Sequence, residues 1–310
     1  MPRTYSVPVH SRDLPWWGYD LAIGVMLLLG VLTAGLWAFL GHYGIAALCA
    51  AALSVILYGS FIEPRLLRVR RYSVGKGERV LKVAFLSDIH VGPYKGTAWV
   101  RRVARMTNAL QPDLVLLGGD YLYAQARDLW KLAPLKELKG SLGVYAILGN
   151  HDEWRAIKES KAWFESAGLP LLLNRSMRVE KEGMGITIAG ADDDWYGETD
   201  LASTFKDARP DDLIIAMLHN PDLAPPAAEL LVGRTAEKTV FFSGHAHGGQ
   251  ICLPFIGPIP HMQHQLGRKY ARGLFNFHGV SLVIGTGLGE SGPRARLFCP
   301  PEIVLTEVRF

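Results

Sequence analysis

The chain has 310 residues, of which 49% are hydrophobic, and its formal net charge is +4 at pH 7. That is enough material for one large globular domain and a further segment. The charge is only mildly basic, and no Arg/Lys-rich stripe with interleaved aromatic residues occurs, which argues against a nucleic-acid-binding protein. The three cysteines are widely spaced without a C-x-x-C pair, so we expect neither a disulfide framework nor a cysteine-based zinc site.

After an N-terminal tail (residues 1–16), a long apolar segment covers residues 17–62 and contains 42 consecutive residues without Asp, Glu, Lys or Arg. A membrane-spanning helix needs about 20 residues, so this run is long enough for two spans and too long for one. Gly41-His42-Tyr43-Gly44 supplies a turn. We therefore expect a transmembrane helical hairpin with spans near residues 17–40 and 45–62.

Two other structures compete with the hairpin. A cleaved signal peptide has an apolar core of only about 7–15 residues, much shorter than this run. A buried soluble hairpin is the second alternative. Trp16, Trp17 and Tyr19 at the start of the segment favour the membrane, because aromatic residues gather at membrane interfaces.

Arginines flank the apolar segment on both sides, and its turn carries neither Lys nor Arg. They are Arg3 and Arg12 before it and Arg65, Arg68, Arg70 and Arg71 after it. The positive-inside rule then places both ends of the hairpin in the cytoplasm, which predicts a multi-pass protein of the bacterial inner membrane with its catalytic part in the cytoplasm. A periplasmic orientation is the alternative. Residues 63–79 are expected to be a basic linker, in solvent or against anionic headgroups.

From residue 80 to 310 the sequence alternates between short apolar runs and helical periods, which indicates an α/β domain with a mixed sheet. Strands are expected at 80–86, 114–117, 143–148, 185–189, 213–218, 239–242, 281–284 and 303–308. Helices are expected at 97–110, 128–138 and 153–167.

Five of the expected strands are followed by carboxylate, imidazole or amide side chains, and sites in α/β folds collect at the carboxyl ends of strands. The clusters are Asp88 with His90, Asp120, Asn150 with His151 and Asp152, His219, and His245 with His247. This ligand set suits Mn, Fe, Zn or Ni better than Ca or Mg alone. The number of candidate ligands exceeds the need of one ion, so we expect two, with Asp120 shared between them. If the segment after 239–242 stays extended, His245 and His247 lie on one side of the backbone.

The blocks D-x-H, G-G-D, G-N-H-D, H-N-P and G-H-A-H-G-G, in this order, resemble the calcineurin-like metallophosphoesterase superfamily over roughly residues 80–310. Within it, the chain is similar to membrane-associated bacterial phosphodiesterases, a group that includes a UDP-2,3-diacylglucosamine pyrophosphohydrolase of lipid A synthesis. The resemblance implies a four-layer α/β/β/α sandwich of two mixed sheets. It also implies a dinuclear-metal-dependent hydrolase of phosphodiester or pyrophosphate bonds, with Mn²⁺ as the expected metal and Fe, Zn or Ni as alternatives.

The resemblance also assigns roles to the residues of these blocks. The first metal would be held by Asp88, His90, Asp120 and His247, and the second by Asp120, Asn150, His219 and His245. Hydroxide would be the nucleophile. His151 would act on the leaving-group oxygen, and Asp152 would orient that imidazole.

A long Gly/Pro-rich segment, residues 248–301, follows the last candidate ligand and is expected to overhang the site. Its apolar part, residues 253–260, would meet acyl chains or bilayer, and Arg268 or Arg272 would bind a substrate phosphate. Folding back onto a sheet edge is the equal alternative.

The remaining polar candidates are expected to have no direct role at the site. The acidic run Asp192-Asp193-Asp194 is expected to be a solvated turn, with a supporting role at the site as the alternative. The other histidines are expected at surfaces or interfaces and receive no role: His10, His42, His261, His264 and His278.

A hairpin anchor would hold the site within reach of the cytoplasmic leaflet, which favours a lipid-linked substrate such as UDP-2,3-diacylglucosamine. Hydrolysis of soluble phosphodiesters is the alternative. A third candidate, a non-catalytic membrane-tethered binding protein, is expected to lack one or more of the ligands, and none is missing here.

Overall fold

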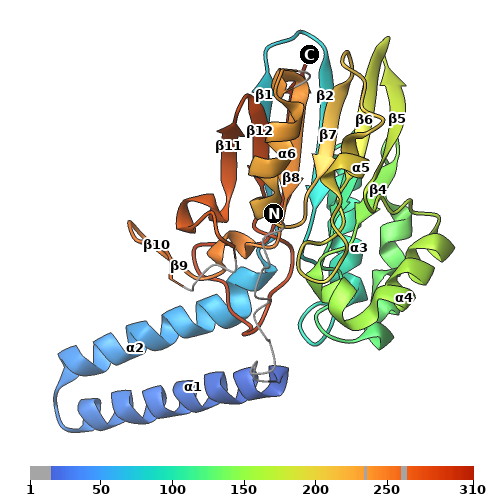
Figure 1. Ribbon diagram of the computed structural model, residues 1–310. Coiled ribbons are helices and arrows are strands. Elements are labelled where there is room, and N and C mark those ends of the chain that lie inside the picture. Colours follow the sequence, from blue (N-terminus) through green and yellow to red (C-terminus); the bar gives the residue numbers. More distant parts are fainter. Residues whose placement is uncertain (1–14, 234–235, 260–263) are drawn as a thin grey trace.

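A computed structural model describes residues 15–233, 236–259 and 264–310 (Figure 1). Arg3, His10, Arg12 and His261 lie outside the described residues. The chain begins with two antiparallel helices, α1 (Trp16–Phe39) and α2 (Tyr43–Leu57), that extend away from one end of the remaining structure.

The two helices have the length and composition of membrane spans. Helix α2 continues through a π-helical turn, η1 (Tyr58–Ile62), into a 3₁₀ turn, η2 (Glu63–Arg65). The spans then cover 24 and 23 residues with a mean hydropathy of 2.2, and most of their apolar side chains are exposed. A buried soluble hairpin does not fit this exposure, because burying apolar surface is what stabilises a soluble core.

The rest of the chain contains two large mixed sheets. The first has the strand order β1-β13-β2-β3-β4 and the second the order β11-β12-β8-β7-β6-β5. The first sheet consists of β1 (Arg68–Gly75), β2 (Val80–Leu86), β3 (Leu114–Gly118), β4 (Val144–Ile147) and β13 (Glu302–Arg309). The second consists of β5 (Arg175–Lys181), β6 (Met184–Gly190), β7 (Leu213–Met217), β8 (Thr239–Ser243), β11 (Gly273–Phe277) and β12 (Val280–Ile284).

The central strands are mainly apolar because both of their faces are buried, although Lys82 near the start of β2 is exposed. In β2, Val83 and Phe85 face the other sheet, while Ala84 and Leu86 face the helices. The same alternation runs through β3, β7 and β8, and one core cluster joins the inner faces of the two sheets.

Helices cover the outer face of each sheet, which completes four layers. The first sheet packs against α3 (Thr97–Ala109), the 3₁₀ segment η3 (Ala126–Glu137) and α4 (Asn150–Ala167), which is kinked at Ala156. The second packs against α5 (Leu201–Phe205) and α6 (Ala224–Leu231). Short turns η4 (Pro221–Leu223), η5 (Ala236–Lys238), η6 (His247–Gly249) and η7 (Arg268–Ala271) and the ribbon β9 (Cys252–Leu253) with β10 (Gly257–Pro258) complete the fold. The predicted α/β/β/α sandwich is confirmed.

The expected linker at residues 63–79 is wrong in its middle part, where β1 pairs in parallel with β13 along its whole length. Five of the eight residues of β1 are exposed at the edge of the sheet, so basic side chains are tolerated there and conceal the strand pattern. Strands β5 and β11 also lie at sheet edges and were not predicted; exposed basic residues conceal the pattern in β5, whereas β11 has none.

Polar contacts fix both ends of the helical hairpin to the domain. At the start of α1, Arg294 Nη2 lies 3.0 Å from Asp20 Oδ2. At the end of α2, the buried carboxylate of Glu63 accepts the backbone N–H groups of Phe298, at 3.0 Å, and Cys299. The hairpin is therefore attached beside the segment that follows β12.

Candidate dinuclear metal centre

Loops from both sheets bring the five predicted clusters together. Strands β2, β3 and β4 are parallel neighbours in the first sheet, and β7 and β8 are parallel neighbours in the second. Their carboxyl ends therefore open toward the same end of the sandwich, and the candidate ligands follow each strand within a few residues.

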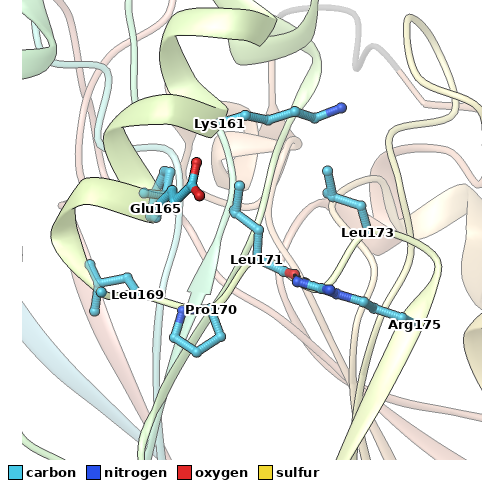
Figure 2. Close-up of a pocket in the computed structure, with 9 residues that line it drawn as sticks. Lys161, Glu165, Leu169, Pro170, Leu171, Leu173 and Arg175 are labelled. Carbon is cyan, nitrogen blue, oxygen red and sulfur yellow. Dashed lines mark hydrogen bonds between the residues drawn. The ribbon is translucent and has the colours of Figure 1, made fainter.

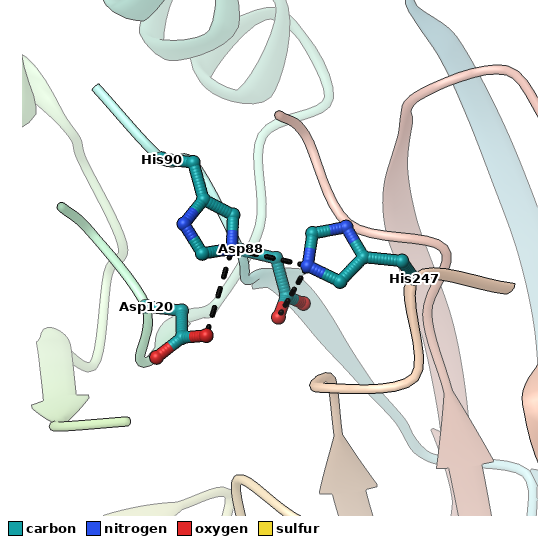
Figure 3. Close-up of side chains that lie close together, drawn as sticks. All are labelled: Asp88, His90, Asp120 and His247. Atoms are coloured by element: carbon teal, nitrogen blue, oxygen red, sulfur yellow. Dashed lines mark hydrogen bonds and ion pairs between the residues drawn. The ribbon is translucent and has the colours of Figure 1, made fainter. Parts of the chain in front are cut away.

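The first ligand group contains Asp88, His90, Asp120 and His247, and one ligand atom of each lies within 4.8 Å of the others (Figure 3). His90 Nε2 lies 3.0 Å from His247 Nε2 and 3.5 Å from Asp120 Oδ2. His247 Nε2 lies 3.6 Å from Asp88 Oδ1. All four residues are buried.

The second ligand group contains Asp120, His219 and His245 within the same limit of 4.8 Å, again all buried. Asn150 completes it, because its Oδ1 lies 2.9 Å from His245 Nδ1 and 3.3 Å from His219 Nε2. Asp120 is shared: its Oδ2 faces His90 and its Oδ1 faces His219, at 3.4 Å. The structure thus brings together all seven residues predicted as metal ligands, in the two predicted sets.

Hydrogen bonds to backbone carbonyls set the orientation of two of the imidazoles. His90 Nδ1 lies 3.0 Å from the carbonyl oxygen of Leu122, and His219 Nδ1 lies 2.7 Å from that of Gly118. A ring that donates through Nδ1 presents the lone pair of Nε2, and such outer bonds are typical of metal-binding histidines. Sequence reasoning could not find these carbonyls, because any residue type supplies one.

The donor set fits divalent cations. Burial lowers the pKa of His90 to about 3, and burial is also the main cause that lowers the pKa of His247, so both rings are neutral at pH 7. His90 Nε2 and His247 Nε2 lie 3.0 Å apart. Because His90 Nε2 carries a lone pair, a cation or a proton is needed between these two nitrogen atoms. Asp88 Oδ2 is also buried without a hydrogen-bond partner in the described structure. An uncompensated buried carboxylate is costly, and a bound cation would remove that cost.

The pKa of His219 shifts in the opposite direction from those of His90 and His247. Burial alone would lower its pKa, but the carboxylates of Asp120, Asp88 and Asp193 outweigh burial and hold the pKa well above its usual range. In the absence of a cation, a proton on this ring supplies the positive charge that these carboxylates need. A divalent cation would take over that role and displace the proton.

Backbone strain is concentrated in the ligands. Asp88, His90, Asp120, His245 and His247 all have positive φ angles, between 47° and 62°. This left-handed region is uncommon for residues other than glycine, and such residues cluster at functional sites. Two glycines permit the close approach, because a Cβ at Gly149 or Gly244 would overlap a carboxylate oxygen of Asp120 or Asp88.

The expected extended conformation of His245 and His247 is wrong. Strand β8 ends at Ser243, and the chain then turns tightly through η6. The two rings consequently enter different ligand groups, His247 the first and His245 the second. Alternation could not predict this, because the positive φ values at both histidines end the strand geometry on which the argument rests.

His151 lies beside the first ligand group, as predicted, but Asp152 does not orient its imidazole. His151 Nδ1 is 2.8 Å from the carbonyl oxygen of Tyr123, and the ring packs edge-on to His90 with 4.6 Å between centroids. The carboxylate of Asp152 is buried instead among the backbone N–H groups of Tyr121, Leu122 and Gly149. Asp152 therefore holds the loop after β3 against the start of α4, and the predicted contact with the imidazole is wrong.

The acidic run 192–194 is not a solvated turn. Asp193 is 1% exposed, and one of its oxygens accepts the backbone N–H groups of Trp195 and Tyr196. This turn holds the indole of Trp195 edge-on against His245, with 4.6 Å between ring centroids. Trp195 was missed; the aromatic pair directly after the acidic run was its only signal in the sequence.

Part of the long segment after η6 folds back onto the second sheet, and contact of its apolar part with acyl chains or bilayer stays a prediction. Strands β11 and β12 fold back and extend the second sheet beside β8, whereas the β9–β10 ribbon carries the exposed side chains of Phe255 and Ile256 at its tip. Arg272 Nη1 donates to the carbonyl oxygen of Phe298, and Arg268 is exposed in η7. In the described part of the chain neither arginine bonds to a ligand residue, so their role in phosphate binding stays a prediction.

One cavity of the described structure lies apart from the candidate centre. A cavity of about 670 Å³ lies beside the last turns of α4, lined among others by Lys161, Glu165, Leu171 and Arg175 (Figure 2). No member of either ligand group lines it. Its walls lack the buried imidazoles and carboxylates of the metal centre.

Comparison with known proteins agrees with this geometry. The family model of calcineurin-like phosphoesterases matches residues 81–249, which includes every ligand. The chain belongs to the calcineurin-like phosphoesterase family. By that membership it is a metal-dependent phosphoester hydrolase, and its buried Asp/His cluster suits a dinuclear divalent metal site.

Relatives of this phosphoesterase occur in distant organisms. An uncharacterized metallophosphoesterase of Aquifex aeolicus is 27% identical over 82% of this chain and 97% of its own length. A putative metallophosphoesterase of Caenorhabditis elegans is 28% identical over 76% of this chain, which spans about half of that protein's length (49%). A Danio rerio protein named transmembrane protein with metallophosphoesterase domain is 32% identical over 55% of this chain and 41% of its own.

Metal affinity is expected to fall in acid. Burial raises the pKa of Asp88 to about 6 in the metal-free protein, and a cation binds only the deprotonated carboxylate. Below pH 6 the proton on Asp88 should compete with the metal in addition to the proton on His219, so affinity should fall there by about tenfold more per pH unit than it does above pH 6. Calorimetric titration with Mn²⁺ at several pH values between 4.5 and 8 measures this. A constant affinity over that range would contradict the assignment of Asp88.

Proposed function

We propose that this protein hydrolyses a phosphodiester or pyrophosphate bond in a lipid-linked substrate at the surface of the bacterial inner membrane, with its catalytic part in the cytoplasm. The observation that carries the hydrolytic part is the sharing of buried Asp120 between the two ligand groups. Two ions held about 3.5–4 Å apart clamp the attacking and leaving oxygens of an in-line displacement at phosphorus. We propose Mn²⁺ as the metal, with Fe, Zn or Ni as alternatives.

Each part of the chain has a defined task in this proposal. Bound cations would neutralise charge on the phosphoryl group and activate water. The first and second ligand groups hold those cations. His151 lies against His90 with Nδ1 held by the carbonyl of Tyr123, so its Nε2 is the atom able to deliver a proton to the leaving-group oxygen.

The lipid-linked part of the proposal is supported by the attachment of the hairpin. The ion pair of Asp20 with Arg294 and the bonds of Glu63 join both helix ends to the domain. If α1 and α2 span a bilayer, the domain is held against the membrane surface instead of on a long tether. The exposed apolar tip at Phe255 and Ile256 would then rest in the interface.

A substrate panel tests the proposal. The full-length protein in detergent, loaded with Mn²⁺, should hydrolyse UDP-2,3-diacylglucosamine or another lipid-linked phosphoester with a higher kcat/KM than bis-p-nitrophenyl phosphate. Equal rates on acylated and soluble diesters would instead favour a general phosphodiesterase. Failure to hydrolyse any member with metal bound would support the non-catalytic binding protein. A reporter fused after Phe310 would establish the orientation.

A further inference from the structure

A second cavity adjoins the metal centre on the side of the helical hairpin. It has a volume of about 290 Å³, and His151 forms part of its wall. Two loops and the first turns of α4 supply the domain side, with Tyr123, Trp154 and Ser291 among the lining residues. The opposite wall is not part of the catalytic domain: it is the first turn of α1, with Pro15, Trp16 and Tyr19.

The walls of this cavity are aromatic and uncharged apart from any proton on His151. Trp16, Tyr19, Tyr123 and Trp154 present large apolar surfaces, and the other lining residues are Pro15, Ala124, Gln125, Ser291 and Gly292. A charged group would leave water here without an ion-pair partner among the lining residues, which is costly. An alkyl or acyl group would gain apolar burial, and roughly 300 Å³ is the lower end of the range for ligand pockets.

Several bonds keep these walls in place. Tyr94 Oη donates to the carbonyl oxygen of Trp16 at 3.2 Å, and Asp20 pairs with Arg294 at 3.0 Å. On the domain side, Gln250 bonds to both the carbonyl oxygen and the N–H of Ser291. Gln250 directly follows the turn that carries His247, so the cavity wall and the metal ligands are parts of one bonded unit.

The position of α1 explains which ligand would reach the cavity. The apolar span starts at Trp16, the residue that forms the wall, so a bilayer crossed by α1 would have its interface at this level. A lipid phosphoester in that leaflet has its phosphoryl group and the first part of its chain at the same level. No long extraction from the membrane would then be needed.

We propose that this cavity is the subsite for the apolar part of an amphiphilic phosphoester, and that the start of α1 is a specificity element of the active site in addition to an anchor. The inference rests on the proposed function, since it takes the phosphoryl group to lie at the ligand groups. Trp16 and Tyr19 contact the chain of the substrate, while His151 faces both the cavity and the metal centre.

Two chromogenic diesters that differ only in chain length test the subsite: p-nitrophenyl dodecyl phosphate and p-nitrophenyl ethyl phosphate. In the full-length protein, Trp16→Ala should raise the KM for the dodecyl ester at least tenfold and leave the KM for the ethyl ester within twofold. Trp17→Ala is the matched control, since Trp17 is the next residue of the same helix, is more exposed and does not line the cavity. Equal chain-length preference in the wild type and Trp16→Ala would overturn the proposal.

A binding measurement keeps the inference separate from the proposed reaction. In a Cys49→Ser background, Trp16→Cys should react with a maleimide at least fivefold more slowly when dodecyl phosphate is added, and no more slowly with inorganic phosphate. Trp17→Cys should be unaffected by either. Protection without turnover of any substrate would contradict the proposed function and support the apolar subsite. Turnover with no protection and no effect of Trp16→Ala would support the proposed function and contradict the apolar subsite.

Discussion

Replacement of Asp120 by alanine is expected to abolish hydrolysis, with kcat reduced by on the order of 10³-fold or more, equivalent to about 4 kcal/mol of transition-state stabilisation. Each oxygen of this carboxylate faces one ligand group, at 3.5 Å from His90 and 3.4 Å from His219. Its removal therefore weakens both metal positions at once. Elemental analysis of the purified variant should find both metals lost together with activity.

Two further variants make the Asp120 result specific. Asn150→Ala removes a ligand of the second group only, so it should keep one metal per chain while losing most activity. Asp207→Ala removes an exposed carboxylate that belongs to neither ligand group and should keep both metals and full activity. An Asp120→Ala protein that binds two metals per chain would refute the shared position of this residue.

Strand positions were predictable wherever burial made a run apolar on both faces. Strands β2, β3, β7 and β8 face a core on each side, so their sequences are mainly apolar runs, interrupted in β2 only by Lys82. The edge strand β1 lacked that signal, because it is paired on one side and bears exposed basic residues on the other. Pairing with β13, more than 200 positions later in the chain, is what makes β1 a strand, and no local pattern records such a partner.

The membership of the ligand groups was predictable because residue type and position after a strand are both properties of the sequence. The geometry within the groups could not be predicted from the sequence. The positive φ values at His245 and His247 depend on how the turn packs. The family resemblance predicted the division of the two rings between the two groups, whereas strand alternation taken alone did not. Local alternation is a poor guide where tertiary contacts impose strain on the backbone.

The contacts of the Asp152 side chain likewise could not be predicted from the sequence. Its place directly after His151 is compatible with orienting the imidazole, yet its carboxylate is turned toward the N–H groups of Tyr121, Leu122 and Gly149. The N–H groups of Tyr121 and Leu122 in the loop after β3, and that of Gly149 at the start of α4, would otherwise be buried without this acceptor, and unpaired buried N–H groups are costly. The imidazole takes the carbonyl of Tyr123 instead.

Replacement of His151 by alanine is expected to reduce kcat without removing metal, and by an amount that depends on the leaving group. The ring contacts His90 but belongs to neither ligand group, so two metals per chain should remain. Proton delivery by a positioned side chain contributes about 10²–10⁴-fold, and this loss should appear with an alkyl alcohol as the leaving group, which needs a proton. With p-nitrophenol, whose anion leaves unprotonated, the loss should be about tenfold or less.

The pattern across leaving groups separates proton donation from a structural role of His151. Rates for a series of diesters with leaving groups of rising pKa should give a much steeper dependence on leaving-group pKa in His151→Ala than in the wild type, and the two lines should converge at the most acidic alcohols. His151→Gln is the comparison variant, since it is similar in size and is a poor acid. A uniform loss across the series would show that His151 stabilises charge or shape at the site, because only a proton donor distinguishes good leaving groups from poor ones.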